Sequence, residues 1–141
     1  TKIKGTPKKG PSLFASQGCI ACHALKKSEV QKGPYLGQIG GIMNAEKIAL
    51  SIIRPNAEIS QGFKTVSITT KKGGAHVGFV TKRLSDQIEI RDIAGQITRL
   101  NPADVASETL LPISMMPAGL ANGMSIEDFA SLVHFLAAQK Q

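Results

Sequence analysis

The chain has 141 residues, of which 42% are hydrophobic and 19% are charged. This length suits one domain with a core of its own, and the composition is that of a soluble globular protein. No apolar run reaches the roughly 18 residues that a membrane-spanning helix needs. We therefore expect no membrane span in this chain.

Positive charge is concentrated near the start of the chain. The net charge is +7, and residues 1–32 hold seven lysines and one glutamate, which leaves only +1 for residues 33–141. Such a distribution indicates that an acidic partner docks near this segment, and a solvated basic tail is the alternative. Nucleic-acid binding is not expected, because no aromatic residues are interleaved with the basic ones.

The first part of the chain predicts two helices joined by loops. Residues 1–10 (TKIKGTPKKG) combine Lys, Gly and Pro without periodicity and predict a basic linker or tail. A short helix is expected from Pro11 to about Gly18, followed by a turn-rich loop over residues 26–41. The segment NAEKIALSIIRP predicts a second helix that Asn44 caps and Pro55 ends.

Residues 63–100 change to strand character. Four β-branched runs, separated by KKGG, KRLSD and AG, predict an antiparallel meander of four strands. The segment NPADVA then predicts one helical turn with Asn101 as its cap. The last helix is expected to open at Ser125, in capping-box spacing with Asp128, and to pack one apolar face inward.

Both cysteines of the chain lie in one motif, CIACH, at residues 19–23. The C-x-x-C-H spacing is the attachment signature of a c-type haem, because one turn of chain presents both sulfurs to the vinyl groups and the next residue offers its imidazole to the iron. A redox dithiol is one alternative, although it needs no histidine and usually follows a strand. A zinc site is another, and it would need His76 or His134 from far along the chain.

The order of the motifs resembles that of a class I c-type cytochrome. GCIACH, GPYLGQIG, SMMP and a terminal amphipathic helix follow one another as in that family. More closely, SIIRPNAEISQGF, the strand-rich insertion and SMMPAGL are similar to haem-binding modules of planctomycete and verrucomicrobial proteins. The resemblance implies a mainly α fold, with a class I helical core around one haem and a small antiparallel β-meander inserted at about residues 63–100. Residues 11–141 would then form a single cytochrome c domain.

The resemblance also implies how the haem is attached. One haem c would be bound covalently through Cys19 and Cys22, with His23 as the proximal ligand of the iron. A proximal histidine needs an acceptor for its Nδ1 proton. In the family this acceptor is the carbonyl of the proline in a G-P segment, which is Pro34 in this chain.

The remaining haem contacts are expected further along the chain. Family pattern places the distal ligand directly before a proline, which selects Met116, with Met115 or a second histidine as the alternatives. A thioether is a soft ligand that favours ferrous iron and raises the reduction potential relative to imidazole. Arg54 is expected to donate to a haem propionate.

An iron whose axial positions are both filled by protein exchanges electrons more readily than it binds substrate. We therefore expect an electron-transfer protein or module and no enzyme activity of the chain alone. Its partner would be a redox protein or domain with an acidic docking surface, such as a fused or separate dehydrogenase. The alternatives are a haem-based gas sensor or peroxidase-like enzyme with a labile distal ligand, and a binding module whose haem is purely structural. Thioether attachment of haem implies a periplasmic or otherwise extracytoplasmic location.

Overall fold

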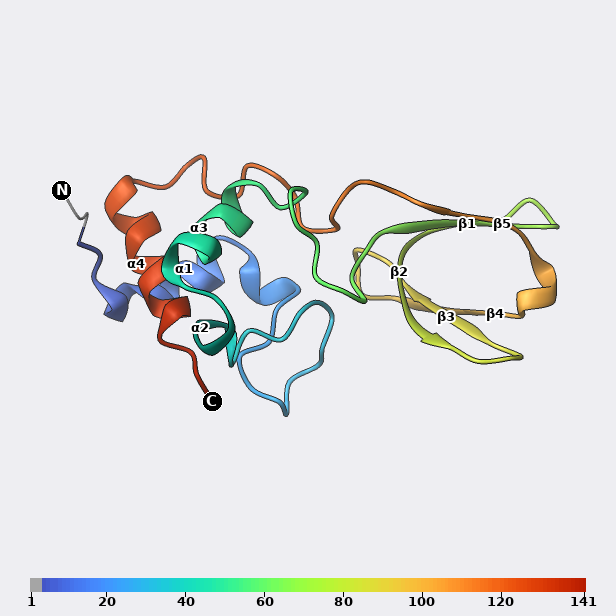
Figure 1. Cartoon of the computed structure of the whole chain (residues 1–141), viewed down its shortest axis with the longest axis horizontal. Helices are drawn as coiled ribbons and strands as arrows, with labels where there is room; N and C mark the ends of the chain where they lie inside the picture. Colours follow the sequence, from blue (N-terminus) through green and yellow to red (C-terminus); the bar gives the residue numbers. More distant parts are fainter. Residues whose placement is uncertain (1–3) are drawn as a thin grey trace. The chain divides into compact units, whose positions relative to one another are not determined.

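The computed structural model describes residues 4–141, and the chain divides into two compact units (Figure 1). The helical unit comprises the chain up to Glu58 together with Pro117–Gln141. The sheet unit comprises Ile59–Met116, which contains the strand-rich insertion. The sequence predicts one cytochrome c domain over residues 11–141 with this insertion inside it, and that domain assignment stays a prediction. No helix in residues 4–141 is both long and apolar enough to span a bilayer.

Short helices build the helical unit. They are the 3₁₀ helices η1 (Pro7–Lys9) and η2 (Cys19–Ala21) and the α-helices α1 (Gly10–Ser16), α2 (Ile39–Ile42), α3 (Ala45–Ile53) and α4 (Ile126–Ala137). The expected caps are present: Asn44 Oδ1 accepts the N–H of Lys47 at 2.9 Å, and Ser125 Oγ accepts that of Asp128 at 3.1 Å. These caps satisfy backbone donors that the first turn of a helix leaves free. Helix α2 lies in a segment that the sequence predicts as loop.

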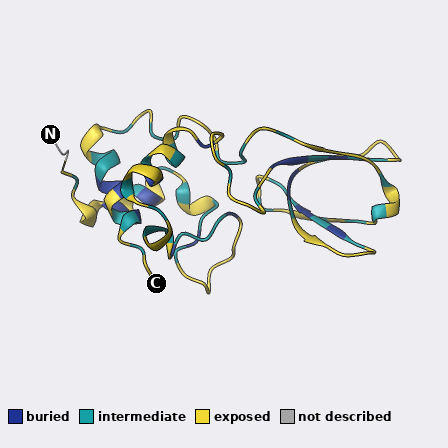
Figure 2. Ribbon diagram, in the orientation of Figure 1, coloured by how far each residue is buried: buried dark blue, intermediate teal, exposed yellow. Residues whose placement is uncertain are grey.

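The core of the helical unit forms where α1, α3 and α4 meet (Figure 2). Phe14 of α1 and Ile48 of α3 are buried there against the apolar face of α4, which contributes Leu132, Val133 and Leu136. The ring of Phe14 also meets Phe135 edge-on, with centroids 6.4 Å apart. This packing sets the direction in which the chain leaves α1 for the CIACH motif.

The segment before α1 differs from the linker that the sequence predicts. Residues 1–3 lie outside the described residues, but Pro7–Lys9 form η1, and the N–H of Thr6 donates to Ser131 Oγ at 2.8 Å. Gly5 approaches α4 so closely that a Cβ at this position would overlap the backbone of Ser131. Backbone contacts of this kind leave no hydrophobic pattern, which is why the sequence does not reveal them.

The sheet unit is a five-stranded antiparallel sheet in the order β4-β3-β2-β1-β5. Its strands are β1 (Val66–Thr70), β2 (Ala75–Arg83), β3 (Ile88–Arg91), β4 (Ile97–Leu100) and β5 (Val105–Leu110). The first four are the strands of the expected meander. The fifth was not expected, and it pairs with β1 with Val66 opposite Leu110. The description as mainly α therefore applies to the helical unit alone.

The two edge strands of the sheet are joined by a short connection. Residues 101–104, with the 3₁₀ helix η3 (Pro102–Asp104), lead from β4 to β5 on the opposite edge. Such a short crossover requires the sheet to curl, because 4 residues span at most about 14 Å. The curl encloses a small core, whose buried members are Val66, Ile68, Ile88 and Ile90. An ion pair between Arg83 of β2 and Glu108 of β5, at 2.6 Å, also links strands that are not neighbours.

Candidate haem site

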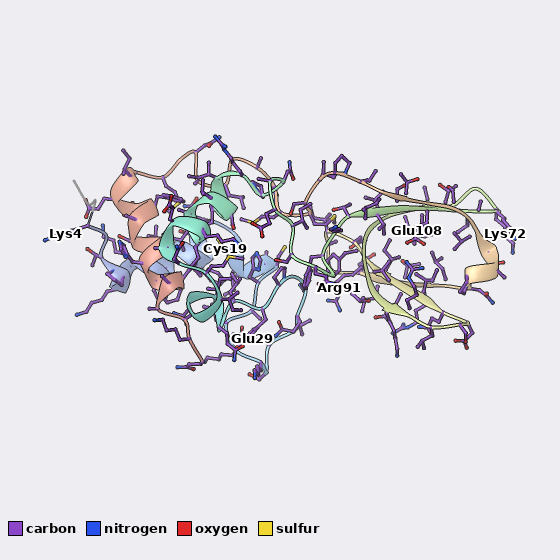
Figure 3. The ribbon with its side chains drawn as sticks, viewed as in Figure 1. Lys4, Cys19, Glu29, Lys72, Arg91 and Glu108 are labelled. Atoms are coloured by element: carbon purple, nitrogen blue, oxygen red, sulfur yellow. The ribbon has the colours of Figure 1, made fainter. Side chains whose placement is uncertain are left out.

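The CIACH motif forms one tight turn directly after α1. The N–H groups of Cys22 and His23 both donate to the carbonyl of Cys19, at 3.2 and 2.9 Å. Cys19 itself lies within the helical unit, where it packs against the core (Figure 3). Two thiols and an imidazole are thereby presented by a single turn of backbone.

The ring of His23 is oriented by a hydrogen bond from a residue further along the chain. Its Nδ1 lies 2.8 Å from the carbonyl oxygen of Pro34. Because a carbonyl can only accept, Nδ1 carries a proton, and in the neutral ring Nε2 then keeps a free lone pair. Burial lowers the pKa of His23, and the hydrogen bond to Pro34 opposes this effect only in part. The imidazole is therefore held neutral, which is the form that binds a metal ion.

The loop that carries Pro34 is tied back to the motif. The N–H of Leu36 donates at 2.9 Å to the carbonyl of Ala24, the residue that follows His23. Ala24 is buried, with only 2% of its surface exposed. This backbone hydrogen bond keeps the Pro34 carbonyl close to the imidazole.

Both cysteines are free and partly buried. Burial raises the pKa of Cys19, a backbone hydrogen bond opposes this, and the neighbouring Cys22 adds a smaller increase. A raised pKa disfavours the thiolate on which dithiol redox chemistry depends. Two thiols and a neutral imidazole with a free Nε2 are instead the donors that a covalently attached haem requires.

Comparison with known families agrees with this chemistry. The family model for cytochrome c matches residues 7–97, which include the CIACH turn and Pro34. The chain belongs to the cytochrome c family. Its cofactor is haem c, attached through Cys19 and Cys22, and its family is one of electron-transfer proteins. No curated protein matches the chain.

In this cytochrome, Arg54 lies at the C-terminal end of α3. Its backbone N–H donates to the carbonyl of Leu50 at 2.7 Å, and the residue is exposed. It lines a pocket of about 460 Å³ along α3, together with Lys47 and Ser51. The side chain is accessible to a ligand, and its role toward a haem propionate stays a prediction.

Met116 is the last residue of the sheet unit, whereas the CIACH motif belongs to the helical unit. The matched residues end before it, so the family comparison does not include the methionine loop. Within this loop Met115 and Met116 are both partly buried, and the N–H of Met116 donates to Ser114 Oγ at 3.1 Å. Ligation of the iron by Met116 therefore stays a prediction.

The two histidines outside the motif have ordinary settings in the cytochrome. His76 lies in β2 and is partly exposed, and His134 is exposed on α4. Within residues 4–141, no group of three or more His, Cys, Asp or Glu side chains gathers that could hold a metal ion.

The sequence did not reveal the role of Glu29 (Figure 3). Its carboxylate accepts the backbone N–H groups of Leu25 and Lys26, at 2.9 and 3.2 Å. These hydrogen bonds order the loop that follows the CIACH turn and presents Lys26 and Lys27 to solvent. The only signal in the sequence is one acid within a lysine-rich segment, which also fits a solvated loop.

Proposed function

We propose that this cytochrome transfers single electrons through a haem whose iron is ligated by His23 and Met116. When bound, haem c supplies a one-electron couple between ferric and ferrous iron. The observation that carries the proposal is the 2.8 Å hydrogen bond between His23 Nδ1 and the Pro34 carbonyl. This hydrogen bond engages Nδ1, which leaves Nε2 available to bind the iron. It also increases the basicity of Nε2 as a ligand.

The distal side of the proposal rests on the chemistry of the methionine loop. A thioether binds ferrous iron better than ferric iron and so raises the reduction potential relative to a second imidazole. Pro117 follows Met116 directly and stiffens the loop that must hold this weak ligand. With both axial positions occupied by side chains, electron exchange becomes the chemistry that is available to the site.

We also propose a partner with an acidic docking surface. Lys26, Lys27 and Lys32 are exposed on the loop between the CIACH turn and Pro34. The resemblance to planctomycete and verrucomicrobial haem-binding modules supports a fused or separate dehydrogenase as this partner. The thioether attachment of haem supports a periplasmic or otherwise extracytoplasmic location.

The ligands can be tested by visible spectroscopy of the purified haem protein. The ferric form is expected to show the weak far-red band of a thioether bound to iron, and the ferrous form is expected to be low-spin and indifferent to carbon monoxide. Met116→Leu should abolish the band and lower the reduction potential, because a soft ligand is lost. Met115→Leu, the matched control, should retain both properties.

Two results would contradict this assignment. If the unmodified ferrous protein binds carbon monoxide readily, its distal position is open or labile, and the gas-sensor or peroxidase-like function takes precedence. If the band survives in Met116→Leu and disappears in Met115→Leu, Met115 is the distal ligand.

A further inference from the structure

The sheet unit anchors the beginning of the methionine loop. Strand β5 ends at Leu110, and the N–H of the next residue, Leu111, donates to the carbonyl of Thr65 at 2.9 Å. Thr65 is fully buried, with 0% of its surface exposed. The backbone at Leu111 is therefore fixed to the sheet, and only residues 112–115 separate it from Met116.

A second hydrogen bond acts within the loop itself. Ser114 Oγ accepts the N–H of Met116 at 3.1 Å, which closes a small turn around Met115. Pro117 restricts Met116 to extended backbone conformations, because its ring clashes with a helical residue before it. The backbone of Met116 is therefore constrained from both sides, by the serine hydroxyl and by the proline.

We propose that Ser114 is a positioning residue for Met116, in a loop that the sheet unit anchors. This inference rests on the proposed ligation of the iron by Met116. A thioether is a weak ligand for ferric iron, so its binding depends on how little conformational freedom the loop loses when the sulfur coordinates. The serine hydroxyl removes part of that freedom before coordination.

The experiment measures how easily an added ligand displaces Met116. Imidazole is titrated into the ferric haem protein and followed by loss of the far-red band. In Ser114→Ala the apparent affinity for imidazole should rise about threefold to tenfold, which corresponds to one lost hydrogen bond. Ser114→Thr retains the hydroxyl and should restore the affinity of the unmodified protein.

Two further variants separate positioning from a general loss of stability. Ser107→Ala makes the same chemical change on β5, at an exposed position, and should leave the imidazole affinity unchanged. Ser114→Val has the shape of threonine without its hydroxyl, so the Thr and Val variants give the same comparison if the alanine variant fails to fold. The valine variant should bind imidazole more tightly than the threonine variant.

Equal imidazole affinities in the Ala, Val and Thr variants would overturn the role of Ser114. Failure of the proposed ligation looks different, because then Met116→Leu would leave the far-red band in place or the unmodified protein would show no such band. If Met116→Leu abolishes the band while all Ser114 variants behave like the unmodified protein, the ligation holds and only the positioning role is wrong.

Discussion

At the scale of single residues, the chemistry of the motif depends on where one proton lies. The string CIACH identifies the groups that attach haem because all of them are close in sequence. It does not determine the tautomer of His23, which depends on a carbonyl 11 residues later. Pro34 could be named in advance only through the family resemblance, since a G-P pair by itself is most simply a turn.

Ser114 shows where prediction from single residues ends. A serine two residues before Met116 is visible in the sequence, but serines are frequent in loops and bond many kinds of partner. Its hydrogen bond to the Met116 N–H became apparent only once the backbone of the loop was known. Arg54 illustrates the same limit, because an arginine at the end of a helix is equally often solvated.

Two adjacent glycines of α2 give a prediction at this scale. A Cβ at Gly40 would overlap the backbone carbonyl of Ala137 in α4, whereas a Cβ at Gly41 would meet nothing within 4 Å. Gly40→Ala should therefore reduce the free energy of unfolding by about 1–3 kcal/mol, as overpacking does. Gly41→Ala should cause no loss and should gain up to about 1 kcal/mol from helix propensity.

Guanidinium denaturation of the two haem proteins, followed by circular dichroism, provides the measurement. Equal free energies of unfolding in the two variants would show that α2 can move away from α4 without loss of stability. The close approach at Gly40 would then have no energetic weight.

At the scale of elements, amphipathic segments with local caps were predictable and edge elements were not. Helices α3 and α4 were expected because a capping side chain and an apolar stripe lie within one short window. Strand β5 was missed because its residues are almost all exposed, so no alternation of apolar and polar residues marks it. Its pairing with β1, some 40 residues earlier, depends on the curl of the sheet.

The packing of the N-terminal segment on α4 gives a prediction for an element. Ser131 is fully buried; its Oγ accepts the N–H of Thr6 at 2.8 Å and donates to the carbonyl of Glu127 at 2.8 Å. Ser131→Ala would leave the Thr6 N–H without this acceptor, which should reduce the free energy of unfolding by about 1–3 kcal/mol. Hydrogen exchange at the Thr6 amide should become faster.

Ser16→Ala is the matched control for this change. Ser16 is exposed on α1, and its hydroxyl donates to the carbonyl of Leu13 in the same helix. Stability and Thr6 exchange should be unaffected in this variant. If Ser131→Ala also leaves Thr6 exchange unchanged, the segment is held by its other contacts and the serine is dispensable.

At the scale of the whole molecule, each unit of the described chain has its own buried cluster. The helical unit is built around Phe14 and Leu132, and the sheet unit is built around Ile68 and Ile90. The start of the insertion could be predicted, because the hydrophobic period changes from helix to strand near residue 63. Its end could not, because β5 (Val105–Leu110) lies beyond the predicted end at about residue 100. The packing of the insertion as a compact unit of its own could not be predicted, because it depends on contacts between strands that are distant in sequence.

The uneven charge leads to a prediction for the molecule as a whole. Oxidation of the ferrous protein by ferricyanide, an anion, should slow as ionic strength rises, because the lysines that attract it are screened. Lys26→Glu combined with Lys27→Glu should slow this reaction by roughly tenfold at low salt. With a cationic cobalt complex as the oxidant, the rate should instead increase as ionic strength rises, and the double substitution should make the reaction faster.

Lys71→Glu combined with Lys72→Glu changes the charge equally, but in the turn between β1 and β2. This control should alter the ferricyanide rate much less than the change at Lys26 and Lys27. Stopped-flow measurements of the two double variants decide the matter. Equal slowing in both would show that net charge alone governs the encounter and that the basic loop has no special role.

The hydrogen bond from the Leu111 N–H to the Thr65 carbonyl bears on how such a chain could evolve. It holds the residues that precede β1 and follow β5 next to each other. The sheet is therefore connected to the rest of the chain in the way that a closed loop is. The entropy of closing a loop grows only slowly with its length, by about 0.6 kcal/mol for each doubling. An ancestor with a short connection here could therefore have gained the sheet in one step, and descendants could exchange it for another without altering the helices on either side.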